Sequence, residues 1–130
     1  MRDYIFHGKR VDNGEWVEGN LTVWPDGSAS IDNGPTMTSP LYAVIPESVG
    51  QYTGMKDKNG RKIFEGDIIQ RVWDDHPTVY RVIFDELLAA FIGEVRPYGQ
   101  FTTFDGDGEH FEVIGTVFEN ADLLESNNTK

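Results

Sequence analysis

The sequence predicts a mainly β fold, either a small single-domain β-barrel-like structure or a curled sheet, with one or two short helical turns. Apolar residues alternate with polar ones at a period of two over most of the chain, as they do in half-buried strands. The 14 glycines interrupt every long apolar stretch, which favours short strands and turns over long helices. A chain of 130 residues that is 38% hydrophobic has the size and apolar content for one packed core.

The first third of the chain predicts short strands separated by turns. The strands cover Tyr4–Phe6, Trp16–Trp24, Ser28–Ile31 and Tyr42–Ile45. Asp12–Gly14 and Pro25–Gly27 predict turns because Asn and Gly tolerate a positive φ, and Gly19 predicts a bulge or bend. Residues 32–40 predict a loop, and Glu47–Tyr52 predicts one helical turn.

The centre of the chain carries the strongest local pattern. Met55–Phe64 predicts a hairpin that turns at Asn59 and Gly60, the residue pair that two-residue hairpin turns prefer. Glu65-Gly66-Asp67 then predicts a corner before the strand Ile68–Trp73, with Gly66 supplying the bend and Asp67 accepting hydrogen bonds from turn amides.

The last third predicts further strands and a short helical end. Thr78–Phe84 alternates as a strand, whereas Leu87–Ile92 fits a buried strand or a short helix, and the strand is favoured because Gly93 follows it. Phe101–Phe104 and Phe111–Phe118 predict a final hairpin. Asn120 then caps a helical turn, so the predicted domain covers residues 1–125 and a polar tail covers residues 126–130. The predicted core contains Val72, Val82, Phe84, Ile114, Phe118 and at least one tryptophan.

Composition excludes several classes of protein. The chain has no cysteine, which excludes disulfides, thiolate nucleophiles and zinc–thiolate sites. Its start lacks the apolar segment of a signal peptide, and its longest apolar run, Leu87–Ile92, is far shorter than the roughly 20 residues that span a bilayer. We therefore expect a cytoplasmic protein.

Charge is strongly negative and unevenly distributed. The net charge is −11, and residues 67–130 hold 4 basic and 13 acidic side chains, a net of −9, against −2 for residues 1–66. Such a surface keeps a protein soluble, or it engages a basic partner or imitates nucleic acid. Direct binding to duplex DNA is disfavoured because the phosphates would meet a negative surface.

Two blocks of the sequence resemble the signatures of a known family, the YopX proteins, which are encoded mainly by phages and prophages. The central block is Val49–Ile69 and the closing block is Glu112–Leu124, where Ala121 stands in place of the family's usual Pro. Residues 6–19 also resemble one branch of the family, with His7 where many members have Arg. The resemblance implies a β-barrel-like fold and a phage context, hence the cytoplasm of a bacterial host, but no activity and no catalytic residues. The motif residues that carry it are Tyr52, Gly54, Asp57, Asn59, Gly60, Glu65, Gly66, Asp67, Ile114, Gly115, Glu119 and Asn120.

Two segments contain residue types found in metal sites. Asp74-Asp75-His76 has suitable ligand types, but consecutive side chains of an extended segment point to opposite sides, which favours a solvated loop. The segment from Asp105 resembles a calcium loop, yet the sixth and twelfth positions, which require Gly and Glu, hold His110 and Thr116. We therefore expect no metal and no cofactor.

The basic residues and the tryptophans allow two readings each. Four basic residues cluster around the central turn: Lys56, Lys58, Arg61 and Lys62. They form either a solvated hairpin tip or a contact for phosphate or an acidic partner. Trp16, Trp24 and Trp73 lie in strand patterns, which favours core or barrel-rim positions over a stacking platform, although interfaces also favour Trp.

The leading functional hypothesis is a non-enzymatic module that binds a host or phage protein. A first alternative is an acidic inhibitor that imitates DNA. A second is a small metal-assisted hydrolase that uses the Asp74–His76 loop. Self-association is a further possibility, which added salt would favour by screening the repulsion between copies.

Overall fold

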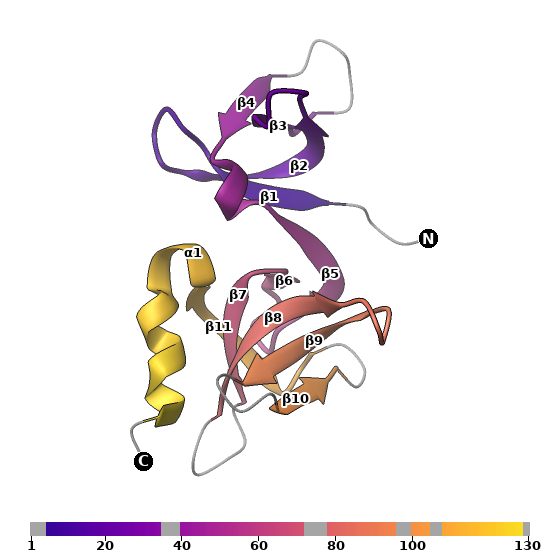
Figure 1. Ribbon diagram of the computed structural model, residues 1–130, viewed down its shortest axis with the longest axis vertical. Coiled ribbons are helices and arrows are strands. Elements are labelled where there is room, and N and C mark those ends of the chain that lie inside the picture. Colours follow the sequence, from indigo (N-terminus) through magenta and orange to yellow (C-terminus); the bar gives the residue numbers. More distant parts are fainter. Residues whose placement is uncertain (1–4, 35–39, 72–77, 96–99, 105–107, 129–130) are drawn as a thin grey trace. The chain divides into compact units, whose positions relative to one another are not determined.

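A computed structural model describes residues 5–34, 40–71, 78–95, 100–104 and 108–128. They form a mainly β structure with antiparallel strands in two open sheets (Figure 1), so the predicted fold class is confirmed in its curled-sheet form.

The chain divides into two compact units, Met1–Tyr52 and Thr53–Lys130. Each unit has its own cluster of buried apolar side chains. The strand registers join residues of the same unit.

Unit 1 is built from short strands in meander order. Its elements are β1 (Phe6–Lys9), β2 (Trp16–Val23), β3 (Ala29–Asp32), β4 (Leu41–Val44), the 3-10 turn η1 (Pro46–Ser48) and the first residues of β5 (Gly50–Lys56). The strand order is β4-β3-β2-β1-β5. Both predicted turns, at 12–14 and 25–27, connect neighbouring strands. Of the predicted loop 32–40, residues 35–39 lie outside the described part of the chain.

The sheet of unit 1 curls until β4 meets the end of β1 and the residues that follow it. Val11 donates its amide to the carbonyl of Ala43 at 2.9 Å, and Ile45 donates to the carbonyl of Lys9 at 2.9 Å. The curl encloses a small apolar cluster, which consists of Val17, Ala29, Ile31 and Val44, with Phe6, Leu21, Tyr42 and Val49 packed against it. Unit 1 thus buries apolar area with few residues because its sheet wraps around them.

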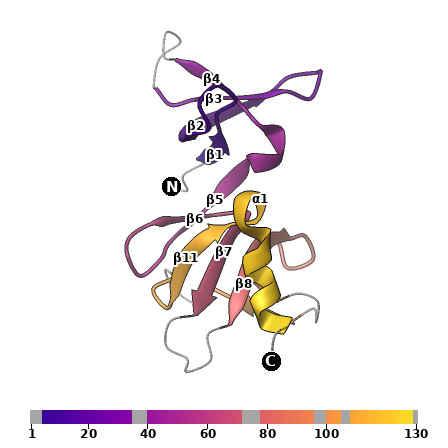
Figure 2. The ribbon, with the colours of Figure 1, turned by 90° about the vertical axis from the view of Figure 1, so that its left-hand side faces the viewer.

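Unit 2 contains the remainder of β5, a short strand beside it, a five-stranded sheet and the helical end. These elements are β6 (Lys62–Phe64), β7 (Asp67–Arg71), β8 (Val79–Asp85), β9 (Ala90–Val95), β10 (Gln100–Thr103), β11 (Phe111–Thr116), α1 (Val117–Asn120) and the 3-10 helix η2 (Ala121–Asn128). The sheet order is β10-β9-β8-β7-β11. The helical end packs against this sheet, α1 on β7 and η2 on β8 (Figure 2).

The end of the chain differs from the prediction in two ways. β10 pairs with β9, and β11 pairs with β7, so the two strands predicted as a final hairpin lie at opposite edges of the sheet. The helix also begins earlier than predicted, because the Thr116 side chain accepts a hydrogen bond from the amide of Glu119 at 3.1 Å and caps the helix. Asn120, the predicted cap, lies inside α1, and η2 extends to Asn128, beyond the predicted start of the tail.

The predicted core is only partly correct. Val82 is fully buried, but Phe84 is 44% exposed and Phe118 is 39% exposed. Ile114 is half-buried, and Val72 lies outside the described residues. The actual core of unit 2 consists of Ile63, Ile69, Tyr80, Val82, Val95, Phe111 and Val113. Alternation predicted the buried face of β8 correctly but could not show that the strand continues past the core.

Neither described tryptophan is a core residue. Trp16 is half-buried and packs its ring on His7 with a centroid distance of 4.6 Å. Trp24 is 43% exposed, and its indole nitrogen donates to the hydroxyl of Ser30 at 3.2 Å. Trp73 lies outside the described residues. The two that are described occupy the surface of unit 1.

Candidate functional site

The central hairpin turn is organised by one buried carboxylate, Asp57, which is only 5% exposed. Its Oδ1 accepts hydrogen bonds from the amides of Asn59 and Arg61, each at 2.9 Å. Its Oδ2 accepts from the amide of Val113 on β11 at 3.0 Å. The carboxylate therefore holds the turn and also ties it to the edge of the five-stranded sheet. This edge contact is reinforced by the amide of Lys58, which donates to the carbonyl of Phe111 at 3.0 Å.

The turn that Asp57 holds displays the predicted basic patch. Lys56, Lys58 and Arg61 are exposed, and Lys62 is half-buried. The Lys58 ammonium lies 3.9 Å from a carboxylate oxygen of Glu112, an exposed pair of the kind that contributes little to stability. Gly60 lies at a φ of +81°, as the predicted turn requires. The structure thus presents these side chains on a fixed turn, whereas their role as a partner contact stays a prediction.

A second buried carboxylate, Asp67, stands at the corner that leads into β7. Its side chain is almost fully buried at 2% exposure, and its Oδ2 accepts from the amide of Phe64 at 2.8 Å. Gly66 precedes it with a φ of +92°, a backbone conformation that L-residues with side chains rarely adopt. The predicted corner is therefore confirmed in its geometry, including the hydrogen bond that Asp67 accepts from a turn amide.

The environment of Asp67 favours its neutral form. Removal from water is the main cause and raises the pKa of Asp67 to about 7, opposed by the hydrogen bond from Phe64 and by the positive charge of Arg61, and assisted by the negative charge of Asp57. Its Oδ1 is buried without a hydrogen-bond partner among the described residues. A carboxyl group in this position holds a proton that an exposed aspartate would release.

The closing block of the sequence meets this corner through β11 and α1. Thr116 pairs with Asp67 across the sheet, and the amide of Val117 donates to the carbonyl of Gly66 at 2.7 Å. The register of β11 against β7 shifts between Val113 and Gly115, so Ile114 is the extra residue of a bulge. This bulge had no signal in the sequence.

The side chain of Asn120 lies so close to Gly115 that a side chain at position 115 would overlap with it. A Cβ atom there would lie 2.7 Å from the side-chain oxygen of Asn120. That oxygen accepts a hydrogen bond from the amide of Thr116 at 3.1 Å. Asn120 therefore folds back from α1 onto the end of β11, and only glycine leaves room for it.

The two sequence blocks interlock in unit 2 through these contacts. Of the remaining motif residues, Tyr52 belongs to unit 1, where it is buried and donates its amide to the carbonyl of Ile5 at 2.7 Å. In unit 2, Gly54 has a φ of +90° and Glu65 is half-buried. The hydrogen bonds that Asp57 and Asp67 accept come from backbone amides. These contacts, which we call the interlock, hold the turns and strands of unit 2 in place. The motif residues Asp57 and Asp67 thus have a structural role.

The two segments with metal-ligand residue types, for which we expect no metal, lie largely outside the described residues. Asp74, Asp75 and His76 lie outside the described residues, as do Asp105 and Asp107 of the second segment. Over the part of the chain that the structure describes, no three side chains of the metal-binding types come together. None of the helices in that part is long and apolar enough to cross a membrane.

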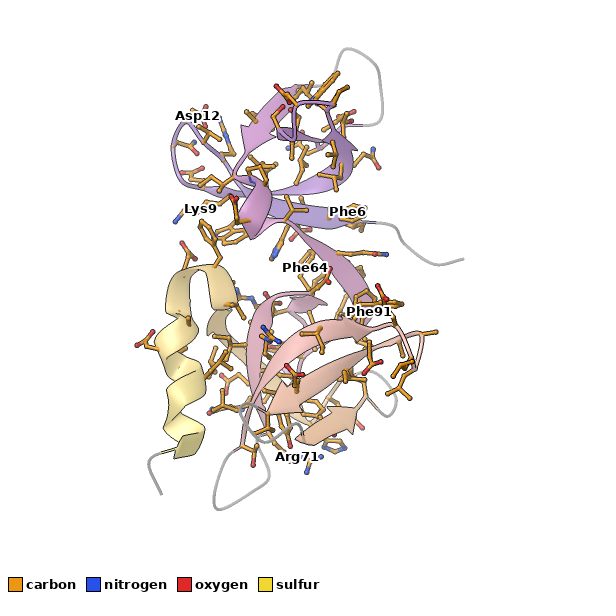
Figure 3. All side chains as sticks on the ribbon, viewed as in Figure 1. Phe6, Lys9, Asp12, Phe64, Arg71 and Phe91 are labelled. Carbon is orange, nitrogen blue, oxygen red and sulfur yellow. The ribbon has the colours of Figure 1, made fainter. Side chains whose placement is uncertain are left out.

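Sequence reasoning missed the apolar hairpin end, which we define as Phe84, Leu87, Leu88 and Phe91 at the connection of β8 and β9. Phe84 and Phe91 are directly paired across the two strands, and their rings meet edge to face at 5.2 Å. Leu87 is 98% exposed and Leu88 is 48% exposed. Phe91 lies on β9 near the turn (Figure 3). The run Leu87–Ile92 is therefore a turn followed by the start of β9, rather than one buried strand.

The turn that displays these leucines is ordered by Asp85. Its Oδ1 accepts from the amides of Leu87 at 2.9 Å and Leu88 at 3.2 Å. Ala89 follows with a φ of +53°, the one positive φ outside glycine in the described part of the chain. Because such a conformation costs an alanine about 1–2 kcal/mol, hydrogen bonds and strand pairing hold the turn in this form.

Comparison with known proteins adds a family and a fold. The family model described as YopX protein matches residues 8–125. The crystal structure of protein EF1440 from Enterococcus faecalis is similar with a TM-score of 0.55 and 24% sequence identity, over 96% of this chain and 100% of that one. At this identity the similarity shows the fold. Among curated proteins, none matches the chain.

Proposed function

The chain belongs to the YopX family, and on this premise we propose that it is a non-enzymatic module that acts by binding another protein of the phage or its host. The observation that carries the proposal is the apolar hairpin end, with Leu87 98% exposed and Phe84 44% exposed on an ordered turn. Large apolar side chains gathered at one exposed place are a mark of protein-interaction sites.

The state of the buried carboxylates supports a binding role over a catalytic one. Asp57 accepts hydrogen bonds from three backbone amides, and Asp67 accepts one from Phe64. A general acid or base must reach the substrate proton that it transfers. Both carboxylates are buried, so they are placed to accept hydrogen bonds from backbone amides and not to reach a substrate.

The test is capture followed by reconstitution. The full chain is immobilised and exposed to lysate of a bacterial host, and every retained protein is then purified and titrated against the chain by calorimetry. We expect one protein to bind with fixed stoichiometry. Partners that are all DNA-binding proteins displaced by duplex DNA would favour the DNA-mimic alternative instead. Metal-dependent hydrolysis lost on Asp74→Asn would favour the hydrolase.

A further inference from the structure

The apolar hairpin end continues the buried face of β8 and β9 out of the core. Tyr80, Val82 and Val95 on this face belong to the core cluster of unit 2. Side chains two positions apart on a strand lie on the same face, so Phe84 follows Val82 on that face and pairs with Phe91. The hairpin therefore carries one apolar strip that starts inside the core and ends at the exposed Leu87 and Leu88.

The hairpin that carries this strip is acidic. The segment Val82–Val95 contains Asp85, Glu86 and Glu94 and no lysine or arginine. Glu94 is paired with Arg81 at 2.6 Å, which leaves Asp85 and Glu86 as the carboxylates at the turn, and Glu86 is exposed. The chain as a whole has a net charge of −11. A negative field of this kind attracts basic surfaces and repels acidic ones.

We infer that the apolar hairpin end docks onto a partner protein whose surface carries an apolar strip bordered by lysine or arginine side chains. This inference rests on the proposed protein-binding function and names the surface and the chemistry of the partner. A second copy of the chain does not fit, because two hairpin ends would bring together carboxylates on two molecules of net charge −11. An anionic lipid surface is disfavoured for the same reason.

The turn is suited to this role because its shape is set before binding. Asp85 holds the amides of Leu87 and Leu88, and the Phe84–Phe91 ring contact fixes the base of the hairpin. Side chains that are already ordered lose less conformational freedom on association. Leu87 and Leu88 are thus the anchors, and Glu86 is the charge that meets the basic border.

Three helical peptides of equal length test the chemistry directly. The first has a leucine strip bordered by lysines, the second has the same strip bordered by glutamates, and the third has a serine strip bordered by lysines. Binding to the full chain is measured by calorimetry, and the contact is mapped by NMR chemical-shift changes. We expect the leucine–lysine peptide to bind at the β8–β9 turn about tenfold or more tighter than the other two.

Variants of the chain separate docking from general charge attraction. Leu87→Ser combined with Leu88→Ser should weaken the leucine–lysine peptide about tenfold, with unchanged thermal unfolding. Val23→Ser is the matched control, since Val23 is an exposed apolar residue of unit 1 at 64% exposure, and it should leave binding unchanged. Glu86→Gln should weaken binding a few-fold and reduce its dependence on salt.

Several outcomes would overturn the inference. Equal binding of the serine–lysine peptide would show charge attraction without an apolar strip. Sedimentation that shows a dimer, lost in the double serine variant, would identify a second copy as the occupant, and flotation with anionic vesicles would identify a lipid surface. If the partner captured from lysate binds the double serine variant as tightly as the original chain, the protein-binding function stands and this docking site is wrong.

Discussion

The interlock around Asp57 and Asp67 and the apolar hairpin end are opposites within one unit. The interlock is polar and buried, and its carboxylates accept hydrogen bonds from backbone amides. The hairpin end is apolar and exposed, and its turn is ordered without being covered. Buried polar groups need partners, and both oxygens of Asp57 and the Oδ2 of Asp67 have backbone amides as partners. The comparison teaches that the described motif residues around Asp57 and Asp67 serve the fold of unit 2, while the proposed docking site lies in a segment outside that motif.

The largest expected effect is at Asp57. Asp57→Ala leaves the amides of Asn59, Arg61 and Val113 without their acceptor. At roughly 1–3 kcal/mol for the buried amide of Val113 and about 0.5–1.5 kcal/mol for each of the two turn bonds, the free energy of unfolding should fall by about 3 kcal/mol or more. Chemical denaturation measures this. Asp122→Ala, which removes an exposed aspartate, is the control and should change it by less than about 0.5 kcal/mol. Equal effects of the two variants would show that the interlock is not a stabilising structure.

Local turn chemistry explains why the interlock was largely predictable. Asn59-Gly60 and Glu65-Gly66-Asp67 specify their turns within a few residues, so the hairpin and the corner with its aspartate follow from the sequence. The partners of these turns do not. The amide of Val113 lies 56 residues from Asp57 along the chain, and no local pattern encodes such a pairing. The same reason explains why β10 and β11 were predicted as a hairpin although they lie at opposite edges of the sheet.

The exposure of the hairpin end was not predictable from the sequence. An alternating apolar pattern shows which face of a strand is apolar, but this face is buried only where the core covers it. Phe84 continues the pattern of Val82, yet Val82 is buried and Phe84 is exposed. Where a strand leaves the core depends on the tertiary packing of its neighbours, as does the division of the chain into two units. The exposed strip therefore became visible only in the structure.

The second prediction is a dependence of stability on pH at Asp67. Its pKa is raised from 3.8 to about 7 in the folded state, so the folded protein binds a proton more tightly than the unfolded chain. This contribution to stability is fully present below pH 4 and is lost as the pH rises to about 7, by on the order of 4 kcal/mol.

Asp67→Asn, which is neutral at every pH, should remove this dependence. The stability of the variant relative to the original chain should therefore increase between pH 4 and pH 8, as measured by urea unfolding at several pH values. A difference that stays constant over this range would contradict the protonation of Asp67 in the folded state.

The third prediction concerns the contact between Gly115 and Asn120. Gly115→Ala places a Cβ atom 2.7 Å from the Asn120 side-chain oxygen and should cost about 1–3 kcal/mol through this overlap. In a chain that already carries Asn120→Ala, the two nearest atoms, Oδ1 and Cγ of Asn120, are gone and only the Cβ at 3.0 Å remains, so the same substitution should cost less. A double-mutant cycle measures the coupling. Additive effects would mean that the two residues do not interact as described.

The fourth prediction separates the true core from the predicted one. Phe118 is 39% exposed on α1, whereas Ile69 is fully buried in the core of unit 2. Phe118→Ala should therefore cost about 1 kcal/mol, well below the 3–5 kcal/mol of a buried Phe, while Ile69→Ala should cost about 2–5 kcal/mol. Thermal unfolding of both variants compares them, and a larger loss for Phe118→Ala would reverse the assignment.

The smallest expected effect on stability is at the basic tip, where the interlock meets the surface. Lys56→Ala and Arg61→Ala remove exposed side chains and should change the free energy of unfolding by less than about 0.5 kcal/mol. Their effect on association is therefore not confounded by a loss of stability.

If the tip is a solvated end of the hairpin, both variants bind the leucine–lysine peptide and the captured partner as tightly as the original chain does. In that case neither the variants nor the original chain binds duplex DNA at physiological salt. If the tip contacts an acidic region of the partner, the two variants weaken that complex while the short peptide, which reaches only the β8–β9 turn, is unaffected. Measuring both ligands with the same variants thus distinguishes a one-site partner from one that spans the tip and the apolar hairpin end.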